Sequence, residues 1–226
     1  KEGFTLSELP KTMKALVAYD KGDYRFEPAY PVPECGPDDI IIKTEGCGIC
    51  AGDLKCYHGN STWGDETHAK WVRPPFIPGH EFLGHVVKTG INVTEYKIGD
   101  RLIADQIVPC GKCKFCKSGR YWMCQPHATF GFQKENNGGM AEYVRYPKTA
   151  VLHHVPEDMP LEKALLIEPY SCSKHAVDRA LTLVNKLNPA AVISDAFYCI
   201  NVYDDPVRFR NDILTLFIMC AVILAV

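Results

Sequence analysis

Four cysteines crowded into the segment CGKCKFCKSGRYWMC constrain this chain more than any other feature of its sequence. They are Cys110, Cys113, Cys116 and Cys124, separated by two, two and seven residues. Two-residue spacers let backbone turns aim successive sulfur atoms at one point about 2.3 Å away, the zinc–thiolate distance. Iron–sulfur ligation and unligated thiols are the alternatives. We interpret the segment as a zinc site, which would be structural because four thiolates fill every tetrahedral position.

The chain has 11 cysteines in total, so the redox environment matters. A short secreted chain with this content would indicate a disulfide scaffold, but the first residues contain no apolar signal segment. We therefore expect a reducing, cytoplasmic compartment in which thiols stay available to metals. The net charge of −2 gives no reason to expect nucleic acid or a charged membrane surface as a partner.

A second set of metal-binding residue types lies upstream. Cys50 follows the β-branched run DDIIIKTEG, and His80 and Glu81 come thirty residues later in FIPGHEFLGHVVKTG. Pro78 and Gly79 predict a turn that presents His80 and Glu81 at the start of a strand. Three protein ligands with one open position are the catalytic zinc arrangement. Taken singly, such a cysteine is also typical of a small buried hydrophobe, and such a histidine of a satisfied polar group.

Six motifs occur in a fixed order: GCGICAGD, PGHEFLGHVVKTG, YKIGDRLI, the four-cysteine segment, GGMAEYVRYP and LIEPYSCSKHAV. This order resembles the zinc-dependent medium-chain alcohol dehydrogenase family, specifically its sorbitol, polyol and threonine dehydrogenase branch. The resemblance covers residues 12–180. It implies a mainly β, GroES-like catalytic domain with short helices, a partly open β-barrel and a structural zinc lobe near residues 105–127. It also implies a catalytic zinc and hydride transfer between a secondary alcohol or polyol and NAD or NADP.

The resemblance assigns roles to individual residues by position. Cys50 and His80 match the first two ligands of the catalytic zinc, and Glu81 matches an acidic residue that can approach the metal. Glu168 stands where polyol dehydrogenases have a glutamate and alcohol dehydrogenases proper have a third cysteine. Asp53 matches a carboxylate that orients the ligand histidine, and its alternative role is that of a turn or cap residue.

Three positions near these residues depart from the family pattern or leave alternatives open. Gly52 stands where many relatives carry a serine or threonine that relays a proton, so that relay is in doubt. Lys55 stands where some relatives have a relay histidine, and is either a water-mediated substitute or a solvated charge. Cys172 aligns with a position that does not bind metal, and we interpret it as core packing.

Residues 58–76 form a long insertion between the two ligand segments. Trp63, His68 and Trp71 in this insertion either line a substrate pocket or pack over the barrel.

The last part of the chain does not fit the family. A helix is predicted for CSKHAVDRALTLV, but no glycine occurs from residue 141 to 226, so the glycine-rich turn that cradles a dinucleotide is missing. A strand is plausible at residues 190–203. The apolar run 213–226 would span about 21 Å as a helix, short of the ~30 Å membrane core. We interpret residues 181–226 as an out-of-family tail from splicing or a gene-model error, with a membrane segment or a buried element as alternatives.

Two functional hypotheses follow. The first is the catalytic-domain portion of a zinc-dependent oxidoreductase that acts on a small alcohol or polyol, is compatible with a homo-oligomer and is inactive by itself. The second is a non-catalytic zinc-binding module used for assembly or interaction. Both hypotheses include the two metal sites. The missing glycine turn predicts that this chain alone catalyses no reaction with a nicotinamide cofactor.

Overall fold

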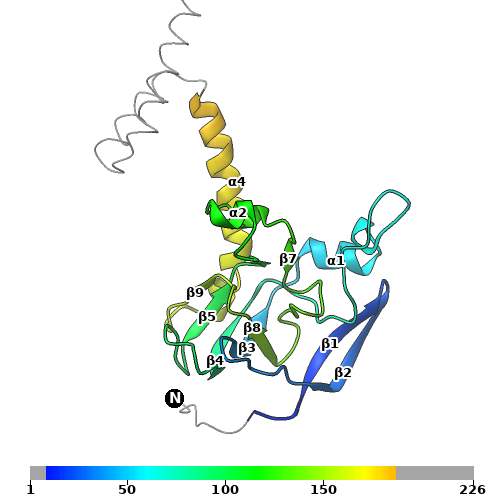
Figure 1. Cartoon of the computed structure of the whole chain (residues 1–226), viewed down its shortest axis with the longest axis vertical. Helices are drawn as coiled ribbons and strands as arrows, with labels where there is room; N and C mark the ends of the chain where they lie inside the picture. The colour runs from blue at the N-terminus through cyan, green and yellow to red at the C-terminus, as the bar shows by residue number, and fades with distance from the viewer. Residues whose placement is uncertain (1–8, 187–226) are drawn as a thin grey trace, which may run out of the picture. The chain divides into compact units, whose positions relative to one another are not determined.

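A computed structural model of the chain describes residues 9–186 (Figure 1). The chain divides after Pro169 into two units, residues 1–169 and residues 170–226. The first unit consists of open β-sheets and short helices, which confirms the predicted mainly β architecture; among the described residues the sheets do not close into a barrel. The strands are β1 (Thr12–Asp20), β2 (Asp23–Pro31), β3 (Ile40–Cys47), β4 (Phe82–Thr89), β5 (Arg101–Ala104), β6 (Ile107–Val108), β7 (Ala128–Thr129), β8 (Tyr143–Tyr146) and β9 (Leu152–His154).

The helices are short except for the last one. They are α1 (Ala51–Tyr57), η1 (Ser61–Trp63), α2 (Lys114–Lys117), η2 (Tyr121–Met123), α3 (Leu161–Ala164) and α4 (Ile167–Lys186), the η elements being single 3₁₀ turns. The helix predicted after Glu168 is therefore confirmed as part of α4. The predicted strand at 190–203 and the apolar run 213–226 lie outside the described residues. Within residues 9–186 no helix combines the length and apolarity needed to cross a membrane.

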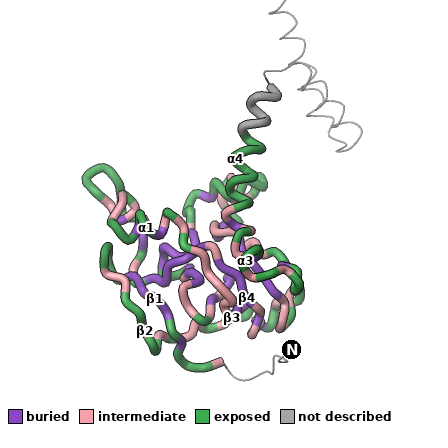
Figure 2. Tube along the Cα trace, turned by 180° about the vertical axis from the view of Figure 1, so that it is seen from behind, coloured by how far each residue is buried: buried purple, intermediate pink, exposed green. Residues whose placement is uncertain are grey.

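A five-stranded antiparallel sheet in the order β8-β3-β4-β5-β9 forms the centre of the first unit. Its second strand, β3, begins with Ile40, Ile41 and Ile42, all buried, because β-branched side chains pack well on a pleated surface. Ile42 pairs with Val86 on one side and Val144 on the other. Figure 2 shows that buried residues concentrate along β1, β3 and β4, so these strands carry the core.

The β1–β2 hairpin is tied to the rest of the unit by backbone hydrogen bonds. The Leu16 amide donates to the Met140 carbonyl at 2.9 Å, and Ala18 and Phe76 exchange bonds of 2.8 and 3.1 Å. Alternate residues of β1, including Met13, Ala15 and Val17, are buried, so one face of this strand packs in the core.

A buried arginine links β5 to two other parts of the unit. Arg101, 3% exposed, donates two hydrogen bonds of 2.7 Å to the Glu45 carboxylate of β3. Its remaining Nη1 donates to the carbonyl oxygens of Pro156 (2.9 Å) and Met159 (2.7 Å). One guanidinium therefore links β5 to β3 and to the loop that leads to α3.

Of the three residues singled out in the insertion 58–76, Trp63 and His68 do not line a substrate pocket. Trp63 is 8% exposed and donates its indole N–H to the Cys56 carbonyl at 2.7 Å, so it packs in the core. His68 is exposed, and its Nδ1 lies 2.8 Å from Asp65 within a local turn. The pocket alternative remains only for Trp71.

Candidate metal centres

The four cysteines of the lobe converge as their spacing predicts. Their sulfur atoms all lie within 4.8 Å of one another, with Cys113 Sγ 3.5 Å and Cys110 Sγ 4.0 Å from Cys116 Sγ. Four sulfurs bound tetrahedrally at about 2.3 Å are about 3.8 Å apart. The geometry therefore fits a single tetrahedral metal with no open position.

Backbone amides prepare these sulfurs for the thiolate state. The N–H groups of Cys113, Cys116 and Cys110 donate to Cys110 Sγ (3.4 Å), Cys113 Sγ (3.5 Å) and Cys124 Sγ (3.2 Å) respectively. Such donors lower the pKa of Cys110 and bring that of Cys113 to about 6. Burial and the adjacent thiols raise the pKa of Cys116 to about 12. A bound cation would offset that last cost, because it favours every thiolate at once.

A second cluster joins Cys50, His80 and Glu81, whose ligand atoms lie within 4.8 Å of one another. The sheet explains why they meet. Cys47 at the end of β3 pairs with Phe82 at the start of β4, so the residues just after one strand and just before the other share one edge. Cys50 then forms the N-cap of α1 and accepts the Gly52 amide at 3.4 Å.

Asp53 is positioned for both of the roles that its place in the sequence suggests. Its Oδ2 accepts the Cys50 amide at 2.9 Å and completes a capping box at the start of α1. Its Oδ1 lies 3.5 Å from Nδ1 of His80, and both side chains are 5% exposed. A carboxylate beside one ring nitrogen is the common way in which a ligand histidine is oriented.

The electrostatics of the second cluster fit a cation. Burial, together with Glu81, Asp53 and Glu168, raises the pKa of Cys50 despite the Gly52 amide. Burial alone would lower the pKa of His80, but Asp53, Glu168 and Glu81 outweigh burial and raise it. Several carboxylates around a thiol and an imidazole form a negative site whose N, S and O donors suit zinc.

Glu168 lies near this cluster but outside the group of three. Ile167 packs with α3 against Leu83 and Ile103, so α4 begins beside the strands that carry the cluster. Glu168 is 7% exposed, and its charge acts on both Cys50 and His80. Its carboxylate therefore adds to the negative charge around the cluster.

The other two positions singled out beside the ligands are exposed. Lys55 is exposed in the last turn of α1. Cys172 is also exposed, so its interpretation as core packing is wrong. The physical reason is that residues 170–179 of α4 are all exposed, and no described core covers them.

Glycines allow two backbone segments to pack closely next to His80. Gly79 has φ +91°, a backbone conformation that glycine adopts readily. A Cβ on Gly138 would lie 2.0 Å from the Gly79 oxygen, and one on Gly131 would lie 2.9 Å from the Gly79 nitrogen. The 131–139 segment therefore packs backbone against backbone beneath His80, and side chains at these positions would push the two segments apart.

The sequence patterns did not single out Phe132, which lies beside the second cluster. Its ring centroid is 5.4 Å from that of His80. A Cβ built on Gly52 would lie 3.7 Å from Cys50 Sγ, 3.9 Å from His80 Cε1 and 4.0 Å from Phe132 Cζ. Gly52 thus faces the cluster and offers no side chain to it. A lone aromatic residue in a loop carries no spacing signal, which is why only the structure reveals this contact.

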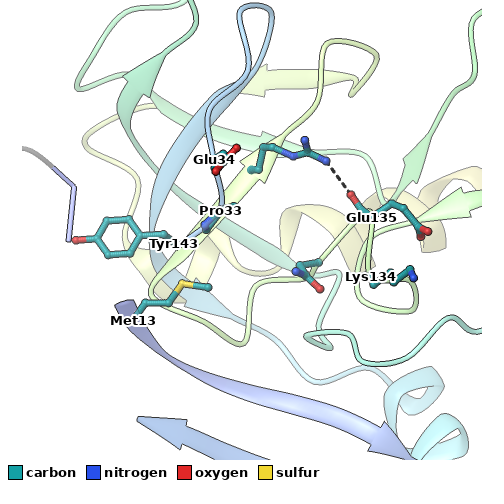
Figure 3. A pocket seen from close by; sticks show the side chains of 8 residues that line it. Met13, Pro33, Glu34, Lys134, Glu135 and Tyr143 are labelled. Carbon is teal, nitrogen blue, oxygen red and sulfur yellow. Dashed lines mark hydrogen bonds between the residues drawn. The ribbon is translucent and has the colours of Figure 1, made fainter. Parts of the chain in front are cut away.

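Two surface pockets lie elsewhere and contain no residue of either cluster. One, of about 160 Å³, has Met13 and Tyr143 on one side and Lys134 and Glu135 on the other (Figure 3). Arg145 also lines it and donates to the Glu135 carbonyl at 3.0 Å. The other, of about 330 Å³, lies beside Tyr96 and Tyr146.

Comparison with known proteins agrees with this geometry. Residues 36–157 match the alcohol dehydrogenase GroES-like domain. The chain is 46% identical over 178 residues to the erythritol/L-threitol dehydrogenase of Mycolicibacterium smegmatis, covering 77% of this chain and 49% of that protein. It is 34% identical over 186 residues to the sorbitol dehydrogenase of Bacillus subtilis, covering 82% of this chain and 49% of that protein.

A solved structure from Sinorhizobium meliloti, described as a zinc-binding dehydrogenase bound to NADP, superposes with a TM-score of 0.64 at 32% identity. The match covers 75% of this chain and 46% of that one. An open, mainly β unit with these two clusters is thus of the zinc-dependent dehydrogenase class. The chain belongs to the zinc-dependent medium-chain alcohol dehydrogenase family, through its GroES-like domain. It spans about half the length of the relatives it matches.

Proposed function

We propose that this chain is the catalytic domain of a zinc-dependent dehydrogenase that oxidises a secondary hydroxyl of a polyol with NAD or NADP. The observation that carries the proposal is the cluster of Cys50, His80 and Glu81, backed by Asp53. The erythritol/L-threitol and sorbitol dehydrogenases among its relatives support a polyol as the substrate. The glutamate at position 168, rather than a cysteine, supports the same branch.

The residues divide into ligands, an orienting group and a proton path. Cys50, His80 and one or both of Glu81 and Glu168 hold the metal, and a bound zinc supplies Lewis-acid activation of the alcohol hydroxyl. Asp53 keeps the His80 ring turned toward the cluster. Gly52 provides no hydroxyl beside Cys50, so the released proton passes to water.

Lys55 is the second candidate for the proton path. It is exposed in the last turn of α1, within the same short helix that Cys50 caps. We assign its ammonium the role of orienting, by hydrogen-bond donation, the water that carries the proton to bulk solvent.

Cofactor binding requires sequence that this chain does not provide. A dinucleotide needs a glycine-rich turn so that the backbone can approach the pyrophosphate, and residues 141–226 contain no glycine. We therefore propose that the 226-residue chain binds metal but performs no dehydrogenation alone. The second hypothesis, a zinc-binding module without catalysis, makes the same prediction for the chain alone and a different one once a cofactor domain is attached.

The metal content provides the first test. We expect two zinc ions per chain by elemental analysis, and one in Cys50→Ala, because that variant loses a ligand of the second cluster only. Cys35→Ala, which changes a thiol outside both clusters, should retain two. A single zinc that persists in Cys50→Ala would contradict the catalytic site. Bound iron with visible absorbance would contradict a zinc lobe.

Activity provides the second test. Residues 1–180 joined to the cofactor-binding half of the Mycolicibacterium smegmatis erythritol/L-threitol dehydrogenase should reduce NAD or NADP when a polyol is added. Activity should fall below detection in Cys50→Ser and His80→Ala versions of the fusion, while their circular dichroism spectra stay unchanged. The 226-residue chain alone should show no saturable binding of NAD by calorimetry. A well-folded fusion that binds the cofactor and two zinc ions without oxidising any polyol would favour the non-catalytic module.

A further inference from the structure

The four cysteines of the lobe differ in their access to solvent. Cys124 is 2% exposed, whereas the other three are half-buried. Among those three, Cys113 Sγ lies 3.5 Å and Cys110 Sγ lies 4.0 Å from Cys116 Sγ. Cys113 and Cys116 therefore form a partly exposed pair whose sulfur atoms are already close together.

Cys113 and Cys116 belong to a single turn of the backbone. Cys113 caps α2, and its Sγ accepts the Cys116 amide at 3.5 Å. A disulfide brings its two sulfurs to about 2 Å, and because both residues lie on one turn no other segment has to move. Cys-x-x-Cys pairs in partly exposed, electropositive surroundings are the reactive dithiols of disulfide oxidoreductases.

Positive charge surrounds this pair. Residues 106–134 contain no aspartate or glutamate, and four exposed residues of the segment are cationic: Lys112, Lys114, Lys117 and Arg120. Within the described residues 9–186, none of the four forms an ion pair with a carboxylate. The Phe115 ring, between the two cysteines, has Lys114 Nζ at 5.0 Å and Arg120 Cζ at 5.6 Å from its centroid. An anion that approaches the pair therefore meets cations that no neighbouring carboxylate neutralises.

We propose that Cys113 and Cys116 are a site of reversible oxidation by small anionic disulfides, and that the bond they form empties the cysteine lobe of its metal. This inference goes beyond the proposed function and concerns the lobe alone. In the first step the Cys113 thiolate attacks one sulfur of the small disulfide, which breaks the S–S bond and releases one thiolate. In the second step the Cys116 thiolate attacks Cys113 Sγ of the mixed disulfide and releases the other thiolate. Two cysteine thiolates are oxidised, one small disulfide is reduced to two thiolates, and no proton is exchanged.

The new bond removes two of the four metal ligands of the lobe. Cys110 and Cys124 remain, and two thiolates do not complete a tetrahedral zinc site. Excess thiol reverses the exchange and restores all four ligands. The metal content of the lobe therefore follows the thiol–disulfide balance of its surroundings.

Zinc release from the 226-residue chain tests the site. Glutathione disulfide, which carries net negative charge, is added in excess to the zinc-loaded chain, and free zinc is followed with a chromogenic chelator. We expect one of the two zinc ions to be released, and we expect Cys50→Ala, which should hold zinc in the lobe only, to release its single ion at the same rate. Excess dithiothreitol with added zinc should restore the original content. If glutathione disulfide releases no zinc, the proposal is wrong.

The basic residues of the lobe allow the new bond to be assigned. Trypsin cleaves after lysine and arginine, so each cysteine of the lobe lies in a different peptide: 102–112, 113–114, 115–117 and 121–134. After free thiols have been blocked, mass spectrometry should find peptide 113–114 linked to peptide 115–117. A disulfide that joins any other two of these peptides, or zinc release without a disulfide in the lobe, would overturn the pairing.

The exposed cations should favour an anionic oxidant. Cystamine, a cationic disulfide, provides the comparison, and the measured quantity is the ratio of the zinc-release rate with glutathione disulfide to that with cystamine. At low ionic strength Lys114→Gln should lower this ratio about threefold, whereas Lys97→Gln, at an exposed lysine outside the lobe, should leave it unchanged. High salt should remove the difference because exposed charges are screened. Equal ratios in the wild type and Lys114→Gln at low ionic strength would overturn the selectivity for anions.

Discussion

Replacing Cys113 with serine should remove one of two zinc ions and loosen the cysteine lobe. Cys113 caps α2, and its sulfur lies within 4.8 Å of the other three. Metal binding at a closed thiolate site is part of the folding free energy, and a serine hydroxyl is a poor replacement for a thiolate. Zinc analysis should fall by one equivalent, and limited proteolysis should cut within residues 105–127 well before any other part of the first unit.

Cys172→Ser is the matched control for this change. Cys172 is exposed and belongs to neither cluster, so its loss should leave the zinc content and the protease pattern as in the wild type. Equal protease resistance of the lobe in Cys113→Ser and in the wild type would argue against a structural metal.

Replacing Arg101 with leucine should lower the free energy of unfolding by about 3–5 kcal/mol. The buried guanidinium donates twice to Glu45 and once each to the carbonyls of Pro156 and Met159. Leucine removes all four bonds and leaves a half-buried carboxylate and two carbonyls without their donor. Urea denaturation of the zinc-loaded chain, followed by circular dichroism, measures the change.

Arg25→Leu provides the comparison on the surface. Arg25 also donates twice to one carboxylate, that of Asp23 at 2.7 Å, but the two side chains are 61% and 37% exposed. Water and salt screen such a pair, so its loss should change stability little. Equal destabilisation by the two variants would show that burial does not make the Arg101 network special.

The parts of this structure that could be predicted from the sequence are those with a local spacing signal. Two-residue spacers between Cys110, Cys113 and Cys116 predicted a convergent lobe, and the turn at Pro78 and Gly79 predicted the start of β4. The meeting of Cys50 with His80 was predicted by family resemblance, and the pairing of Cys47 with Phe82 gives it a physical cause.

The parts that could not be predicted depend on contacts between distant segments. Phe132 and Trp71 are 61 residues apart, and neither belongs to a motif. In the sequence, Arg101 cannot be told from any other charged residue of a strand. Its four acceptor atoms lie on β3 and in the loop before α3, far from it in the sequence. Cys172 lies one helical turn after Glu168, so the spacing suggests that both side chains face the core. In the structure Glu168 is buried and Cys172 is exposed.

The glycine contacts beneath His80 bear on how such a site can be redesigned. Because Gly79, Gly131 and Gly138 meet through their backbones, the height of the metal-binding loop is set without any side chain. The ring of Phe132 belongs instead to a buried hydrophobic cluster with Trp63 and Phe76. Variants that keep the three glycines should therefore preserve the position of His80, whereas alanine at Gly138 should displace it.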